Sequence, residues 1–96
     1  MELQGQVAVI TGAGSGIGKA IALRYARGAN IAVADLNAEG AKQTAAEVRK
    51  IGPKALAKVT DVSSYDQVQA LIAETVKTFG KIEIMVNNTG ELRSEN

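Results

Sequence analysis

The residues whose types and spacing most clearly indicate ligand binding form a glycine-rich stretch near the start of the chain, TGAGSGIG at residues 11–18. It follows the apolar run VAVI at residues 7–10 and opens a run with helical spacing over residues 17–27. A strand that turns through glycines into a helix directs several unpaired backbone N–H groups and the positive end of the helix dipole at one point. Phosphate groups bind at such a point. The stretch therefore predicts a phosphate-binding turn.

The spacing of the glycines separates several kinds of phosphate-binding loop. The P-loop needs Gly-x-x-x-x-Gly-Lys-Ser/Thr, and although Lys19 fits, Ala13 replaces its first glycine and Ala20 its hydroxyl. The motif Gly-x-Gly-x-x-Gly, counted from Gly12, fails at Ile17. The pattern Thr-Gly-x-x-x-Gly-x-Gly fits throughout and, in its strand-to-helix setting, favours dinucleotide binding. An ordinary glycine-rich turn is the structural alternative.

Three glycines have distinct expected roles in such a turn. Gly12 makes a bend with positive φ, Gly16 lets the backbone approach a diphosphate, and Gly18 lets the helix pack closely on the strand. Ser15 and Ile17 lie between them and are expected to contact the same cofactor.

Asp35 ends a second short apolar run, IAVA at residues 31–34. At the tip of a strand beside the glycine turn, its carboxylate can accept both hydroxyls of an adenosine ribose. The same charge repels a 2′-phosphate, and neither Ser15 nor Leu36 supplies a cation to offset it. We therefore expect NAD rather than NADP, with Leu36 as a further contact. A solvated carboxylate in a strand-to-helix turn is the alternative.

The rest of the chain alternates strands and helices. Strands are predicted at residues 7–11, 31–34, 55–60 and 82–86, and helices at residues 17–27, 37–51 and 64–79. Gly28 is the expected C-cap of the first helix, and Asn37 is the N-cap of the second. Ser64 and Gln67 have the spacing of a capping box before the third helix.

This alternation implies an α/β fold with a parallel sheet and right-handed crossovers. About four strands and three helices would form a truncated, Rossmann-like, doubly wound sheet of order 3-2-1-4. The carboxyl ends of the strands would then share one rim. Residues 1–90 are expected to form this dinucleotide-binding half-domain, and residues 91–96 a frayed polar tail.

The glycine turn, Asp35 and the stretch NNTG at residues 87–90 together resemble the short-chain dehydrogenase/reductase family. The resemblance runs from Gly5 to Gly90 and covers only the cofactor-binding part of that family's fold. It implies that Asn88 and Gly90 lie near the ribose on the nicotinamide side of the cofactor.

The resemblance also gives roles to Asp61 and Val62, which follow the third predicted strand. It implies that the Asp61 carboxylate meets the adenine amino group and that the N–H of Val62 meets the ring. The alternative is an Asx turn that leads into the cap at Ser63 and Ser64. Thr89 departs from the family, which has alanine at this position.

Hydride transfer in this family depends on a Tyr-x-x-x-Lys pair. Four residues after Tyr25 stands Ala29, and four after Tyr65 stands Gln69, so no catalytic residue is assigned. A full-length relative would be an oxidoreductase moving hydride between NAD(H) and a secondary alcohol or ketone, and this chain would supply only its NAD-binding part. The alternatives are a non-catalytic NAD-binding module or remnant, and an interaction scaffold that reuses the fold.

The composition of the chain excludes several kinds of functional site and partner. The chain has no cysteine or histidine, which excludes disulfides, zinc sites built on these residues and histidine-dependent catalysis, so no metal site is expected. A net charge of +1 without a basic block argues against nucleic acid as a partner. Without a leader-like start or a membrane-length apolar run, a cytoplasmic protein without membrane contact is expected. Residues 82–86 would lie on a bare sheet edge, which predicts self-association through the fourth strand.

Overall fold

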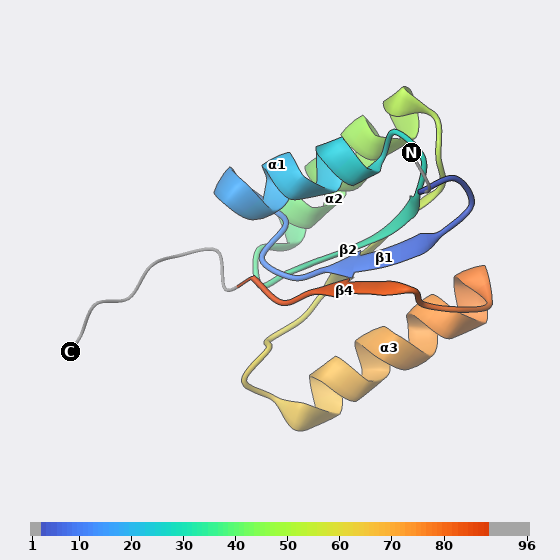
Figure 1. Ribbon diagram of the computed structural model, residues 1–96. Helices are drawn as coiled ribbons and strands as arrows, with labels where there is room; N and C mark the ends of the chain where they lie inside the picture. The colour runs from blue at the N-terminus through green and yellow to red at the C-terminus, as the bar shows by residue number, and fades with distance from the viewer. Residues whose placement is uncertain (1–2, 89–96) are drawn as a thin grey trace.

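The computed structural model describes residues 3–88. Its elements are β1 (Val7–Ile10), α1 (Gly16–Tyr25), β2 (Asn30–Asp35), α2 (Ala38–Ile51), β3 (Ala55–Val59), α3 (Tyr65–Phe79) and β4 (Ile84–Val86). The strands are parallel and follow the order β3-β2-β1-β4. Figure 1 shows α1 and α2 on one face of the sheet and α3 on the other. The predicted α/β fold and strand order are confirmed, while the expected tail at residues 91–96 lies outside the described residues.

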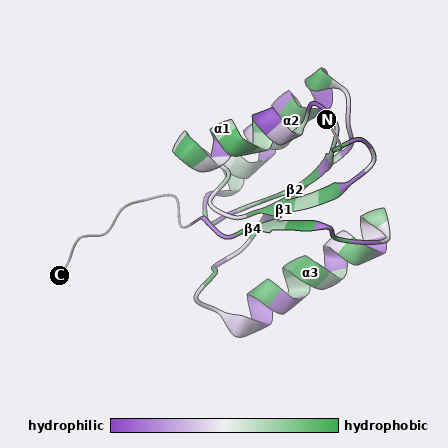
Figure 2. Ribbon diagram, viewed as in Figure 1, coloured by the Kyte–Doolittle hydropathy of each residue, from purple (hydrophilic) through white to green (hydrophobic). Residues whose placement is uncertain are grey.

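The core has two layers because helices cover both faces of the two central strands. β1 is buried along its whole length, which suits the continuous apolar run from which it forms. Alternate residues face opposite sides: Ile10 and Val33 pack under α1 and α2, whereas Val9 packs towards Leu71 of α3. Figure 2 shows this concentration of hydrophobic residues along the central strands.

The first helix is shorter than predicted, and its expected cap is wrong. α1 ends at Tyr25, and its C-cap is Ala26 in right-handed helical conformation rather than Gly28. Gly28 has no side chain for a different reason: a Cβ there would lie 3.1 Å from the Leu3 Cβ and 3.2 Å from the Gln4 nitrogen. The chain before β1 therefore passes so close to this turn that a larger residue would require it to move by a few tenths of an ångström.

The predicted N-caps of the other two helices are confirmed. Asn37 Oδ1 accepts a hydrogen bond from the Gly40 nitrogen at 2.8 Å, and Ser64 Oγ accepts one from the Gln67 nitrogen at 3.3 Å. The second half of the predicted capping box does not form. Gln67 Oε1 instead accepts from the Asp61 nitrogen at 2.8 Å, so this side chain fixes the turn after β3 as well as the start of α3.

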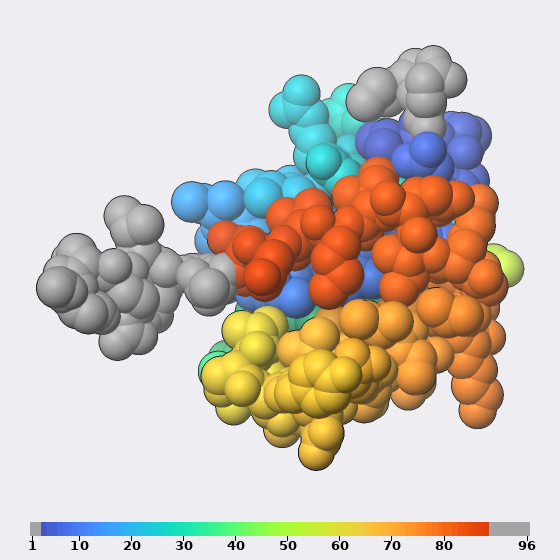
Figure 3. Space-filling model, turned by 60° about the horizontal axis from the view of Figure 1, so that its bottom comes forward, coloured from blue at the N-terminus to red at the C-terminus, as the bar shows by residue number. Residues whose placement is uncertain are grey.

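β4 is an edge strand of three residues, shorter than the predicted residues 82–86. Within residues 3–88 it pairs with β1 alone. Its middle residue, Met85, has 45% of its surface exposed. Figure 3 shows β4 in red on the surface of the molecule beside α3. Among the described residues, no helix has the length and apolar character needed to cross a bilayer.

Candidate functional site

The carboxyl ends of the four strands meet at one rim, and residues far apart in sequence come together there. A hollow of about 70 Å³ opens at this rim. Five of the residues that line it were predicted as cofactor contacts: Gly12, Asp35, Leu36, Val62 and Asn88. The sixth, Thr60, was not predicted. Thr60 follows the last residue of β3 and is 2% exposed. Its position at the end of a parallel strand is the signal that would have marked it as a rim residue.

The loop between β1 and α1 has the expected bend. Gly12 has a φ of +62°, which confirms its predicted conformation. Gly16, the first residue of α1, also has a positive φ, +59°, and no atom lies within 4 Å of the place a Cβ would take. The backbone is therefore open to solvent at the start of the helix, where its unpaired N–H groups lie.

Gly18 brings three segments into contact. A Cβ at Gly18 would overlap the carbonyl oxygen of Gly12 and lie 2.6 Å from the Asn88 Nδ2. The same Nδ2 donates a hydrogen bond to the Gly12 carbonyl oxygen at 3.3 Å. The close packing expected of Gly18 is thus present, but its partners are the loop and Asn88, two residues after β4, rather than a strand.

Thr11 fixes Asn88 from below. Its hydroxyl oxygen accepts a hydrogen bond from the Asn88 nitrogen at 2.8 Å and lies 3.0 Å from the Asn88 carbonyl oxygen, to which it can donate. Thr11 is 2% exposed and Asn88 is half-buried, so these contacts are partly shielded from solvent. The end of β4 is therefore tied to the end of β1 at the edge of the hollow.

Asp35 points towards the glycine loop. Its Oδ2 accepts a hydrogen bond from the Gly14 nitrogen at 2.7 Å, and its Oδ1 accepts one from the Asn37 nitrogen at 2.9 Å. The carboxylate is therefore oriented by two backbone donors rather than simply solvated. It lies on the same rim as the loop, as the parallel topology requires.

Asp61 adopts the Asx turn that was the structural alternative for it. Its Oδ1 accepts hydrogen bonds from the Ser63 hydroxyl at 2.6 Å and the Ser63 nitrogen at 2.9 Å. Both bonds lower the pKa of the Asp61 carboxyl, and the bond from the Ser63 hydroxyl has the larger effect. Asp61 does not line the hollow, whereas the next residue, Val62, does.

The remaining predicted contacts lie around the hollow or outside the described residues. Ser15 is the N-cap of α1, although its side chain makes no capping hydrogen bond. Ile17 and Leu36 are 71% and 68% exposed, which is high for apolar side chains. Gly90 lies outside residues 3–88. Lys19, which matched part of the P-loop pattern, turns away to Glu47 of α2 with 2.7 Å between Nζ and Oε2.

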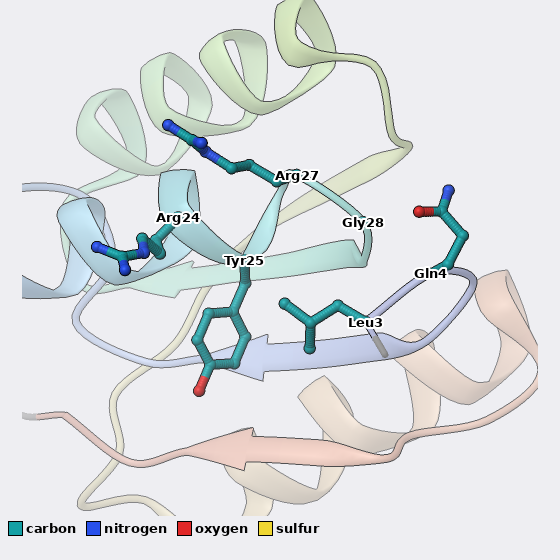
Figure 4. Close-up of a pocket in the computed structure, with 6 residues that line it drawn as sticks. All are labelled: Leu3, Gln4, Arg24, Tyr25, Arg27 and Gly28. Atoms are coloured by element: carbon teal, nitrogen blue, oxygen red, sulfur yellow. The ribbon is translucent and has the colours of Figure 1, made fainter. Parts of the chain in front are cut away.

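A larger hollow, of about 450 Å³, lies at the other end of the sheet and contains none of the predicted site residues. Figure 4 shows Leu3 and Tyr25 turned towards each other across it, while Arg24 and Arg27 extend away. It offers apolar surface near the end of α1 without a set of converging polar groups. The smaller hollow at the rim is therefore the better candidate site.

Comparison with known proteins shows which family the chain resembles in sequence. A family model described as short chain dehydrogenase matches residues 6–96. The 7α-hydroxysteroid dehydrogenase of Escherichia coli (strain K12) is 41% identical over 94% of this chain, and the sorbitol dehydrogenase of Cereibacter sphaeroides is 46% identical over 92%. The chain covers 36% and 34% of these two relatives.

Solved structures show the same likeness. A 7α-hydroxysteroid dehydrogenase complexed with NADH and 7-oxo glycochenodeoxycholic acid is 41% identical, with a TM-score of 0.87 over 90% of this chain and 34% of that protein. An NAD⁺-bound xylitol dehydrogenase is 40% identical, with a TM-score of 0.85 over 88% of this chain and 33% of that protein. The chain thus spans about a third of the length of these relatives. Since both sequence and fold match, the chain belongs to the short-chain dehydrogenase/reductase family.

Proposed function

We propose that this chain is the NAD-binding part of an oxidoreductase that moves hydride between NAD(H) and a secondary alcohol or ketone. The observation that carries the proposal is the 2.7 Å hydrogen bond from the Gly14 nitrogen to Asp35 Oδ2. It sets a carboxylate suited to ribose hydroxyls directly against a loop suited to a diphosphate. The NADH and NAD⁺ in the two related structures support the same choice of cofactor.

In this proposal the diphosphate lies over the start of α1, where Ser15, Gly16 and Ile17 present backbone N–H groups and the positive end of the helix dipole. The open space beside Gly16 supports that position. The ribose on the adenosine side takes the free acceptor sites of Asp35. The negative charge of Asp35 would repel a 2′-phosphate about 4 Å away. The repulsion is roughly 1 kcal/mol per charge pair in water and about 4 kcal/mol near a protein surface.

The adenine and the nicotinamide ends of the cofactor would lie on either side of the diphosphate. The adenine ring lies between the exposed side chain of Leu36 and Val62, with the unused oxygen of Asp61 facing its amino group. The nicotinamide-side ribose lies at Asn88, which Thr11 holds in place, and at Gly90. The hollow of about 70 Å³ would take only one part of the molecule, and the rest would lie along the rim.

In this proposal, the residues of the 96-residue chain bind the cofactor but do not themselves catalyse hydride transfer. Neither Tyr25 nor Tyr65 is followed by lysine at the fourth position. We therefore expect no turnover of secondary alcohols by the 96-residue chain alone. The names of the relatives cover a hydroxysteroid, sorbitol and xylitol, so they support alcohol oxidation as the shared chemistry and leave the substrate open.

The test is a titration of the chain with NAD and NADP by isothermal calorimetry. We expect NAD to bind more tightly than NADP. Asp35→Arg should weaken NAD by about tenfold, because the ribose hydroxyls lose their carboxylate acceptor. It should strengthen NADP by about tenfold, because a charge that attracts the 2′-phosphate replaces one that repels it. Glu74→Arg, which makes the same charge change on α3, should leave the preference unaltered.

Two results would count against the proposal. A wild-type chain that binds neither cofactor would contradict the NAD-binding function and favour the scaffold alternative. A preference for NAD that survives Asp35→Arg would show that the ribose lies elsewhere on the rim.

A further inference from the structure

Four residues connect the glycine loop to the first turn of α2, and we call them the Asp35 clamp: Gly14, Asp35, Asn37 and Gly40. The Gly14 nitrogen donates to Asp35 Oδ2 at 2.7 Å, and the Asn37 nitrogen donates to Asp35 Oδ1 at 2.9 Å. The Gly40 nitrogen in turn donates to Asn37 Oδ1 at 2.8 Å. These three bonds run without a gap from the loop to the helix.

A backbone contact closes the set. A Cβ at Gly40 would lie 2.9 Å from the carbonyl oxygen of Gly14 and 3.3 Å from its carbonyl carbon and Cα. A Cβ at Gly14 would lie 2.9 Å from both Cγ and Oδ2 of Asp35. Neither glycine has a positive φ, so the limit at these two positions is space rather than backbone conformation. A side chain at Gly40 would meet the backbone of Gly14, and one at Gly14 would displace the Asp35 carboxylate.

We infer that the Asp35 clamp positions the dinucleotide-binding loop, and that Asn37 and Gly40 of the α2 start are positioning residues for the cofactor. The inference rests on the proposed function. Asn37 and Gly40 need not touch the cofactor in this account. They act by holding Asp35 and Gly14 where the ribose and the diphosphate meet them.

The acceptor capacity of the carboxylate supports this role. A carboxylate has about four acceptor sites, two on each oxygen. The clamp uses one on each oxygen of Asp35, which leaves one on each for the two ribose hydroxyls. The carboxylate is thus already oriented before the ligand arrives, and a preorganised site loses less free energy to ordering on binding.

The first test compares Gly40→Val with Ala38→Val in the 96-residue chain. Both changes add a branched side chain to the first turn of α2, but Ala38 is exposed while Gly40 lies against Gly14. We expect the dissociation constant for NAD to rise about tenfold in Gly40→Val and to change less than about twofold in Ala38→Val. Gly40→Ala, the conservative variant, should lie between wild type and Gly40→Val. Equal dissociation constants in the two valine variants would overturn the inference.

A second pair of variants covers the case in which Gly40→Val does not fold. Asn37→Ala and Ser64→Ala each remove the side chain that caps a helix, at α2 and α3 respectively. Both should lower the melting temperature, because each loses a cap. Only Asn37→Ala should weaken NAD binding, since Ser64 has no part in the clamp. Equal effects of the two variants on the dissociation constant would reduce Asn37 to a purely structural role.

Hydrogen exchange of the Gly14 amide separates this inference from the proposed function, because it needs no cofactor. We expect the Gly14 N–H of the free chain to exchange about tenfold faster in Gly40→Val than in Ala38→Val. If the wild-type chain fails to bind NAD while Gly14 exchange still accelerates, the proposed function is wrong and the clamp stands. If exchange is the same in both variants, the clamp is wrong whatever the chain binds.

Discussion

At the scale of single residues, a buried hydroxyl on α2 is out of keeping with the core around it. Thr44 is fully buried, and its Oγ1 has no hydrogen-bond partner among residues 3–88. A buried polar group without a partner costs about 1–3 kcal/mol. Thr44→Val keeps the shape and removes that cost, so we expect the free energy of unfolding to rise by about 1 kcal/mol, measured by urea denaturation.

Thr75 supplies the matched control for this prediction. It is a fully buried threonine on α3, but its hydroxyl donates to the Leu71 carbonyl oxygen at 2.7 Å. Thr75→Val therefore removes a satisfied bond and should lower the free energy of unfolding by about 0.5–1.5 kcal/mol. Shifts of the same sign in the two variants would show that the hydroxyl of Thr44 is not the cause.

The rim residues show how far single side chains can be predicted from sequence. Asp35 was predictable because a polar residue that ends an apolar strand must lie at the rim of a parallel sheet. Asp61 has the same setting, yet Ser63 two residues later draws its carboxylate into a local turn. The contact of Gly14 with Gly40 depends on how closely α2 approaches the loop, and no local pattern reports that distance.

At the scale of elements, predictions held where a local device fixes the boundary. Asn37 and Ser64 cap their helices through bonds to residues three positions ahead, which the sequence displays directly. The end of α1 was misplaced because Gly28 leaves room for Leu3 and Gln4 and does not cap the helix. This is a contact between residues distant in sequence, so the local pattern does not show it. Tertiary contacts of this kind override a local capping signal.

The entry to β4 depends on a side chain that continues the sheet. The Glu83 nitrogen donates to the Val7 carbonyl oxygen at 3.0 Å, and its Oε1 accepts from the Val7 nitrogen at 2.7 Å. The Lys81 Nζ lies 2.8 Å from Glu83 Oε2. The Lys81 bond first, and then the Val7 bond, lower the pKa of the Glu83 carboxyl in the folded chain.

This lowered pKa predicts an acid-sensitive contribution to stability. Because the folded pKa lies below that of the unfolded chain, about 4.3 for glutamate, the contribution is complete above that value. It is lost as the pH falls through the folded pKa. Thermal unfolding of wild type and Glu83→Gln between pH 3 and 7 should show wild type as the more stable at neutral pH, with the difference shrinking in acid.

Lys81→Gln provides the check on this mechanism. It retains the bond between Glu83 and Val7 but removes the larger cause of the lowered pKa, so most of the acid dependence should disappear. A difference between wild type and Glu83→Gln that stays constant across this pH range would contradict the account.

At the scale of the whole molecule, the two edges of the sheet differ in their cover. β3 lies close to α2 and α3, whereas within the described residues the backbone of β4 comes close to that of β1 alone. Beside β4, a hollow of about 380 Å³ opens on the α1 side, lined by Ile17, Ala20, Ile21, Arg24, Tyr25 and Val86. This edge of the sheet is therefore the less covered of the two within residues 3–88.

The open edge of β4 leads to a prediction about the isolated chain. An unpaired strand edge with apolar neighbours is a template for pairing with another chain. We therefore expect the 96-residue chain to self-associate through β4, with a weight-average mass in sedimentation experiments that rises with concentration. Met85→Lys should shift the chain towards monomer, because a charge at the edge opposes strand pairing.

Ile51→Lys is the matched control, because Ile51 is 47% exposed against 45% for Met85 but ends α2, on the side of the sheet away from β4. It removes a comparable amount of exposed apolar surface and adds the same charge. If general stickiness drives association, both variants will dissociate alike. If strand pairing drives it, only Met85→Lys will, and a wild-type chain that stays monomeric at every concentration would contradict both explanations.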